Sequence, residues 1–97
     1  MIGYAIRLSP AARSRLLTIS KTSYKKVSAF IDSLQTMPCM GRVYDPIYDA
    51  ARLPFECRVA YSGQYGVYYT VHDSEHLVYI RYIEDQRRDP RRRFDES

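Results

Sequence analysis

Apolar residues in the first third of the chain recur at every second position and then at helical spacing. Residues 4–8 alternate between apolar and other side chains, which predicts a half-buried strand. Ser9 and Pro10 follow, a hydroxyl able to cap a helix and a proline suited to its first turn. Thr22 and Ser23 can cap a second helix, which carries an apolar stripe on one side. This part of the chain therefore predicts a strand and a helical hairpin.

The second half of the chain predicts an irregular loop followed by three strands. Residues 42–54 show no periodicity, whereas residues 55–61, 65–72 and 76–83 are alternating or rich in β-branched and aromatic side chains. The turns between these strands are too short for parallel crossovers, so the strands must form antiparallel hairpins. We therefore expect one α+β domain over residues 1–97, of order β-α-α-β-β-β. Its helical hairpin packs on a small, mainly antiparallel four-stranded sheet, and a short arginine-rich segment follows.

Length and composition place the chain among small globular domains. It has 97 residues, of which 45% are hydrophobic and 27% are charged. No apolar run approaches the roughly 20 residues that span a bilayer, so we expect no membrane partner. The first residues show no secretory signal, which predicts a cytoplasmic protein in which Cys39 and Cys57 are reduced thiols.

The positive charge is unevenly distributed along the chain. Residues 1–31 contain six basic side chains and no acidic one, while residues 84–97 balance five arginines with five acids. The net charge of +4 therefore originates in the helical hairpin, where Lys21, Lys25 and Lys26 are candidate RNA contacts. Such a charge distribution suits a polyanion such as RNA, DNA or the ribosome surface.

Several segments resemble the toxins of the RelE/ParE superfamily of type II toxin–antitoxin modules. They are YAIRLSPAA at the first strand, SLQTMP with the following Gly41, YGVYYTV, and HLVYIRYI running into RRDP. The resemblance implies a toxin held inactive by a cognate antitoxin protein. RelE-like members cut mRNA on the ribosome, and the compact basic hairpin favours this activity. PCMGR instead resembles the P-x-x-G-R of many ParE-like chains, which poison DNA gyrase. An inactive RNA-binding or antitoxin-binding domain is a third hypothesis.

Metal-free RNA cleavage needs side chains that neutralise a pentacoordinate phosphorane and move two protons, without a metal or cofactor. Arginine suits the first task because its planar fork donates two hydrogen bonds to phosphate and keeps its charge. Arg58 alternates with Cys57 and Val59 and is expected on an open surface, opposite those two residues. Arg81 interrupts an apolar strand, and Glu84 at the end of that strand is a candidate general base. The catalytic candidates are therefore Arg58, Arg81 and Glu84, together with Arg87 and Arg88 of the terminal segment.

Aromatic side chains on or near the predicted sheet are candidates for base stacking, namely Tyr61, Tyr65 and Tyr68. Phe94 lies near the position where RelE-like toxins place a terminal tyrosine. A phenylalanine there can stack on a base, but it cannot transfer a proton.

The third strand departs from the pattern that the resemblance implies. Many RelE-like toxins carry a phosphate-binding arginine after the tyrosine that starts this strand, and here Gly66 occupies that position. Arg58, Arg81 or a terminal arginine can substitute for it, or Gly66 can open room for substrate. His72 and His76 flank a turn that also contains Asp73 and Glu75, which we interpret as an ordinary polar turn with too few ligands for a metal.

Overall fold

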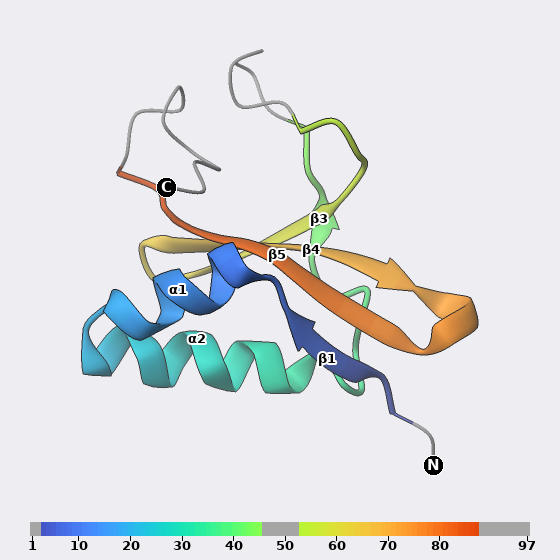
Figure 1. The fold of residues 1–97 in the computed structure, drawn as a ribbon, viewed down its shortest axis with the longest axis horizontal. Coiled ribbons are helices and arrows are strands. Elements are labelled where there is room, and N and C mark those ends of the chain that lie inside the picture. The colour runs from blue at the N-terminus through green and yellow to red at the C-terminus, as the bar shows by residue number, and fades with distance from the viewer. Residues whose placement is uncertain (1–2, 46–52, 88–97) are drawn as a thin grey trace.

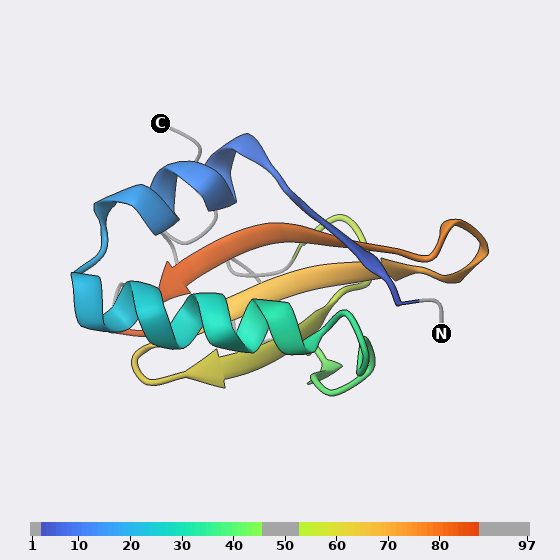
Figure 2. The same cartoon turned by 90° about the horizontal axis from the view of Figure 1, so that it is seen from below.

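The computed structural model describes residues 3–45 and 53–87, in which two helices cover one face of a five-stranded sheet (Figures 1 and 2). The elements are β1 (Ala5–Leu8), α1 (Pro10–Thr18), α2 (Lys21–Ser33), β2 (Arg42–Val43), β3 (Arg58–Ser62), β4 (Tyr65–His72), a 3-10 turn η2 (Asp73–Glu75) and β5 (Leu77–Asp85). The strand order is β1-β5-β4-β3-β2, and only the β1–β5 pair is parallel. The predicted α+β fold is confirmed, with one short additional strand.

Serine side chains begin both helices. Ser9 Oγ accepts a hydrogen bond from the Ala12 N–H at 3.0 Å, as the sequence predicted. The prediction that Thr22 or Ser23 caps the second helix is wrong, because Ser20 Oγ accepts the N–H of Ser23 at 3.2 Å. The first helix ends at Thr18, so Ser20 is the first hydroxyl available to start α2.

The segment expected to be an irregular loop contains the edge strand β2. Arg42 and Val43 lie opposite Val59 and Arg58, which a two-residue strand cannot reveal through periodicity. The strand expected to start at residue 55 begins instead at Arg58, since the chain bends at residues 54–55, where the Phe55 ring packs on the Arg81 guanidinium. This change of direction shapes one wall of the candidate site.

The sheet is packed on both faces. The helix-covered face holds the larger cluster, which includes Leu16, Val27, Ile31, Val67, Tyr69 and Ile80. The opposite face holds a smaller cluster of Cys57, Val59 and Tyr68, against which Tyr44 and Phe55 pack. The neighbouring side chains of Tyr68 and Tyr69 are both fully buried, one in each cluster. β4 is therefore the central strand that both layers share.

Candidate functional site

A cavity lies at the end of β4, where this strand extends beyond its neighbour. The β3–β4 ladder ends with Arg58 opposite Tyr69. Residues 70–72 therefore pair with β5 on one side and with no strand on the other, within the part of the chain that the structure describes. The cavity at this unpaired edge has a volume of about 440 Å³, and its lining includes Arg58, Arg81 and His72. Two of the predicted catalytic arginines thus converge on one space.

Arg81 enters this cavity as a cation held between two aromatic rings. Its Cζ lies 4.7 Å from the ring centre of Phe55 and 4.5 Å from that of Tyr79. Cation–π contacts of this kind orient a guanidinium without neutralising its charge. Its Nε is buried and has no hydrogen-bond acceptor among the described residues. Among the described residues, Arg81 therefore forms no ion pair, and its buried Nε is an unused donor.

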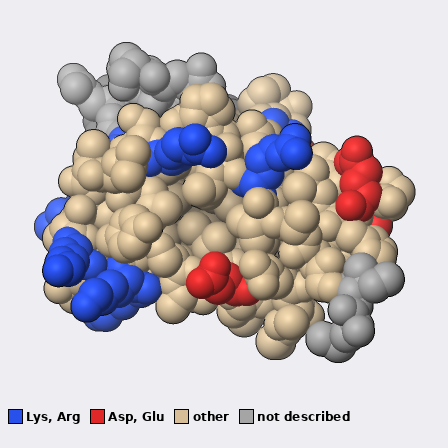
Figure 3. All heavy atoms as spheres, turned by 60° about the horizontal axis from the view of Figure 1, so that its bottom comes forward, with Lys and Arg blue, Asp and Glu red and all other residues tan. Residues whose placement is uncertain are grey.

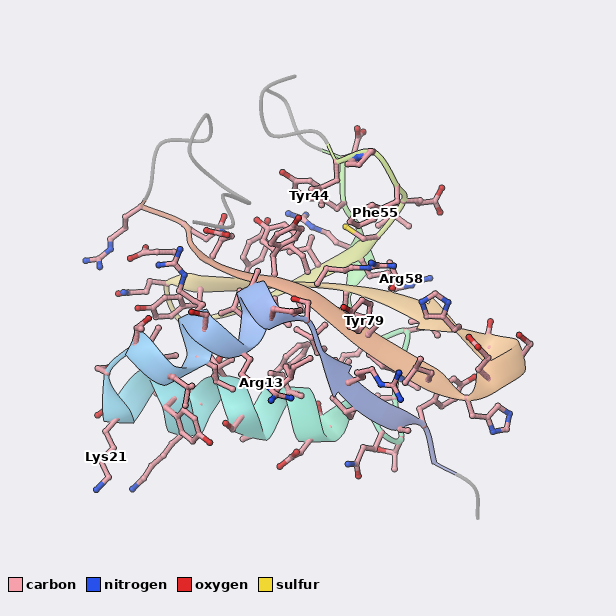
Figure 4. The ribbon with its side chains drawn as sticks, in the orientation of Figure 1. Arg13, Lys21, Tyr44, Phe55, Arg58 and Tyr79 are labelled. Atoms are coloured by element: carbon pink, nitrogen blue, oxygen red, sulfur yellow. The ribbon has the colours of Figure 1, made fainter. Side chains whose placement is uncertain are left out.

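Arg58 reaches the cavity from the other side of the sheet. It lies opposite Tyr69 in the ladder, so its side chain starts on the helix-covered face, and the predicted alternation with Cys57 and Val59 is observed. Its Nη1 donates to the Gly41 carbonyl at 2.7 Å, which leaves the other guanidinium N–H groups for a ligand. Figure 4 shows Arg58 near Phe55, where the chain enters β3.

The phenol of Tyr69 lies next to this arginine and was not among the predicted site residues. Its oxygen accepts the Gly41 N–H at 2.8 Å. Burial raises the pKa of Tyr69, and the Gly41 N–H and the Arg58 charge oppose that rise only in part. The phenol is therefore neutral at physiological pH.

His72 supplies an imidazole to the same cavity. Its Nε2 lies 3.0 Å from Thr70 Oγ1, and its Nδ1 lies 3.9 Å from the Glu75 carboxylate. From the sequence, this side chain was interpreted only as part of a polar turn. The sequence signal that could have identified His72 is its spacing of two residues from Thr70, which places both side chains on the same face of β4. In the described part of the chain, no three His, Cys, Asp or Glu side chains could hold a metal ion.

The opposite end of the sheet holds two more of the predicted catalytic residues, Glu84 and Arg87, in ion pairs. Glu84 is only 3% exposed and lies 3.5 Å from Arg15 of α1. Arg87 forms a 2.9 Å ion pair with Asp85, and its hydrogen bonds hold the pKa of that carboxyl below the usual range. Neither Glu84 nor Arg87 lines the 440 Å³ cavity. Arg88 and Phe94 lie outside the described residues.

The space at Gly66 is filled by its neighbours. A Cβ at Gly66 would lie 2.5 Å from Gln86 Nε2 and 3.1 Å from the Tyr68 hydroxyl oxygen. Gln86 Nε2 also donates to that hydroxyl at 3.0 Å. The hypothesis that Gly66 opens room for substrate is therefore wrong, because a glutamine and a tyrosine occupy that room.

The candidate RNA-binding side chains are dispersed. The rings of Tyr65 and Tyr68 are buried, whereas Tyr61 is 47% exposed and lies 5.7 Å from the Arg42 guanidinium carbon. The predicted hairpin lysines, Lys21, Lys25 and Lys26, are all exposed on α2. Figure 3 shows Lys and Arg gathered at one end of the helical face and along its upper margin, and in Figure 4 Lys21 points away from the sheet, far from Phe55.

The basic surface of the hairpin is thus separate from the cavity.

Within the part of the chain that the structure describes, neither helix is long and apolar enough to cross a membrane.

Comparison with known proteins gives one family and one fold. Residues 6–90 match the family model of the ParE toxin of the type II toxin–antitoxin system parDE. None of the curated protein sequences matches the chain significantly.

Three solved structures share the fold at low sequence identity. The archaeal RelE–RelB complex from Pyrococcus horikoshii has a TM-score of 0.72 and 18% identity, covering 91% of this chain and 100% of that one. A RelBE toxin–antitoxin complex from Mycobacterium tuberculosis has a TM-score of 0.69 and 21% identity, covering 88% and 93%. The isolated E. coli RelE toxin has a TM-score of 0.62 and 16% identity, covering 89% and 87%.

Proposed function

The chain belongs to the family of ParE toxins of type II toxin–antitoxin systems, and we propose, from the arginines at its cavity rather than from the family match, that it is a ribosome-dependent mRNA endonuclease. The observation that carries the proposal is the convergence of Arg58 and Arg81 on one cavity. Neither guanidinium has a carboxylate partner among the described residues. A phosphodiester is the ligand class that suits two guanidinium groups outside ion pairs, although the carboxylates of Glu56 and Asp73 line the same cavity.

The chemistry needs only groups that orient RNA, neutralise charge and move protons. The 2′-hydroxyl attacks the adjacent phosphorus, and the bond from phosphorus to the 5′-oxygen breaks. The products are a 2′,3′-cyclic phosphate and a 5′-hydroxyl end. Arg58 and Arg81 neutralise the charge that accumulates on the non-bridging oxygens in the transition state.

Proton transfer is assigned to His72, which lines the same cavity. One proton leaves the 2′-hydroxyl and one reaches the leaving 5′-oxygen, and an imidazole can accept the first or donate the second. Glu84 is not proposed for this step, because it is buried in its ion pair with Arg15.

The same proposal includes partners and a compartment. The RelE structures from Pyrococcus and Mycobacterium are complexes with antitoxins, and we propose that a cognate antitoxin likewise holds this chain inactive. The exposed Lys21, Lys25 and Lys26 suit contact with ribosomal RNA, because their charges are far from the cavity and remain available to a second surface. The activity then takes place in the cytoplasm, where ribosomes translate mRNA.

A reconstituted translation system tests the proposal. Purified toxin is added to ribosomes translating a defined mRNA, and primer extension maps new 5′ ends. We expect cleavage inside the reading frame that requires ribosomes and is absent with Arg58→Ala. Intact mRNA at toxin concentrations that saturate the ribosomes would refute the nuclease.

A second function, inhibition of DNA gyrase, is supported by two observations. The matching family model is that of ParE toxins. In addition, Gly66 on β4 stands where many RelE-like toxins have an arginine, and Gln86 and Tyr68 fill the space beside it. A supercoiling assay with purified gyrase separates the two functions. Inhibition of supercoiling together with intact mRNA would establish the gyrase inhibitor in place of the nuclease.

A further inference from the structure

Tyr69 makes a polar contact that its buried position does not require. The ring belongs to the helix-side core and is fully buried. Its hydroxyl nevertheless reaches across the sheet to the backbone at Gly41 and accepts the N–H at 2.8 Å. A buried phenylalanine would fill the same volume without this contact, so the hydroxyl contributes a specific connection.

Gly41 uses both of its peptide groups in this region. Its N–H donates to Tyr69, and its carbonyl accepts from Arg58 Nη1 at 2.7 Å. A Cβ at Gly41 would lie 2.7 Å from the Tyr69 hydroxyl oxygen and 2.8 Å from the Val59 carbonyl oxygen. Only glycine therefore allows the backbone to approach the phenol this closely.

We infer that Tyr69 is a positioning residue for Arg58, acting through the backbone of Gly41. The inference rests on the proposed function, in which Arg58 contacts the phosphate. The phenol fixes the Gly41 peptide, and the Gly41 carbonyl fixes one nitrogen of the guanidinium. The remaining donors of Arg58 are then held at the cavity wall before a ligand arrives, which lowers the entropy that a long side chain loses on binding. Tyr69 is fully buried and also borders the cavity, and the role inferred for it is to hold Gly41 rather than to bind the phosphate.

Side-chain NMR of the free protein tests the connection independently of any activity. In Tyr69→Phe, we expect the Gly41 amide signal to shift and the Arg58 Nη signals to collapse into one exchange-averaged signal. The matched control is Tyr68→Phe, which removes a hydroxyl from the adjacent, equally buried ring in the other cluster. Unchanged Arg58 signals in Tyr69→Phe, or an equal change in Tyr68→Phe, would overturn the inference.

A double-mutant cycle tests the functional consequence. Tyr69→Phe should lower the rate of ribosome-dependent cleavage about tenfold, the effect of one lost hydrogen bond at the site. In an Arg58→Ala background, the same change should lower it no further, because there is no guanidinium left to position. Additive effects of the two substitutions would show a general structural role for Tyr69 and contradict the inference.

The two tests separate failure of the inference from failure of the proposed function. If wild-type protein cleaves no mRNA, the nuclease proposal fails, while the NMR experiment still decides whether Tyr69 positions Arg58. Thermal unfolding of each variant accompanies the cycle. Two further variants should also disturb the Arg58 signals. Tyr69→Trp cannot form the hydroxyl contact, and Gly41→Ala places a methyl group against the phenol oxygen.

Discussion

Arginines lie at both ends of the central hairpin of β4 and β5, but their partners differ. At the end with the cavity, Arg58 contacts a backbone carbonyl and Arg81 contacts two aromatic rings. At the other end, Arg15 pairs with Glu84 and Arg87 pairs with Asp85. Among the described residues, the two cavity arginines are therefore outside ion pairs, although Glu56 and Asp73 also line the cavity, whereas the arginines at the opposite end are paired.

This difference shows that the type of partner, rather than the number of arginines, marks the candidate site. A neutral carbonyl or an aromatic ring orients a guanidinium and leaves its charge for a ligand. A carboxylate both orients the guanidinium and neutralises it. The four predictions that follow test this distinction.

The largest effect is expected for loss of an uncompensated cation. Arg58→Ala should reduce ribosome-dependent cleavage roughly 100-fold or more, because a preorganised donor to the transition-state charge is removed. Arg87→Ala at the paired end should reduce it by less than about threefold, since an exposed ion pair contributes little. Initial cleavage rates measured by primer extension check both variants. Equal losses for the two arginines would remove the distinction between the ends.

The paired end should instead determine stability. Glu84→Gln keeps the shape of a buried side chain but removes the charge that faces Arg15. We expect the free energy of unfolding to fall by about 1–3 kcal/mol, while cleavage per folded molecule is retained. Urea unfolding and the cleavage assay on the same preparation measure the two quantities. A fully stable but inactive Glu84→Gln would place this carboxylate in the chemistry after all.

Filling the space at Gly66 is expected to have a smaller effect on stability. Gly66→Ala brings a methyl group against Gln86 Nε2 and the Tyr68 ring, so the free energy of unfolding should fall by about 1–2 kcal/mol. Shortening Gln86 to alanine should relieve the clash. The double variant Gly66→Ala/Gln86→Ala should therefore lose less unfolding free energy than the sum of the losses in the two single variants. Strict additivity of the unfolding free energies would argue against direct contact.

The smallest effect concerns the thiol that borders the cavity. Burial raises the pKa of Cys57 from 9.0 to about 11, although the Arg81 charge opposes the rise. The stability that depends on this protonated thiol is complete below pH 9 and is lost as the pH rises to about 11. Between pH 8 and pH 10 it should decrease by about 1 kcal/mol in wild type.

The control for this prediction is Cys57→Ala, which lacks the titrating group. Urea unfolding at the two pH values should show a smaller loss of stability in the variant, since every other side chain is the same in both proteins. An identical pH dependence would show that the thiol is not protected in the folded state.

Most of the fold was predictable from local signals. Alternation identified β1, β-branched and aromatic residues identified β4, and Ser9-Pro10 identified the start of α1. The start of α2 was misplaced because three neighbouring hydroxyl residues can each cap a helix, and only the end of α1 selects Ser20. β2 was missed because two residues carry no period, and its pairing with β3 depends on tertiary structure.

The candidate site was predictable only in part. Arg58 and Arg81 stood out as charges within strands, and both line the cavity. Glu84 and Arg87 looked equivalent to them in sequence, because nothing local shows that α1 brings Arg15 to Glu84 or that Arg87 folds back on Asp85. Tyr69 was missed because only the depth of its burial and the path of Gly41 distinguish it from the other strand tyrosines.

The central claim is that the arginines at the cavity, and not those at the paired end, bind the RNA backbone. NMR measures this binding directly through the guanidinium Nε–Hε signals. The protein is titrated with a trinucleotide that carries a 2′-deoxy substitution and therefore cannot be cleaved. We predict that the Arg58 and Arg81 signals shift on saturation, whereas those of Arg15 and Arg87 stay in place. Shifts confined to Arg87 and Arg15, or none at Arg58 and Arg81, would contradict the claim.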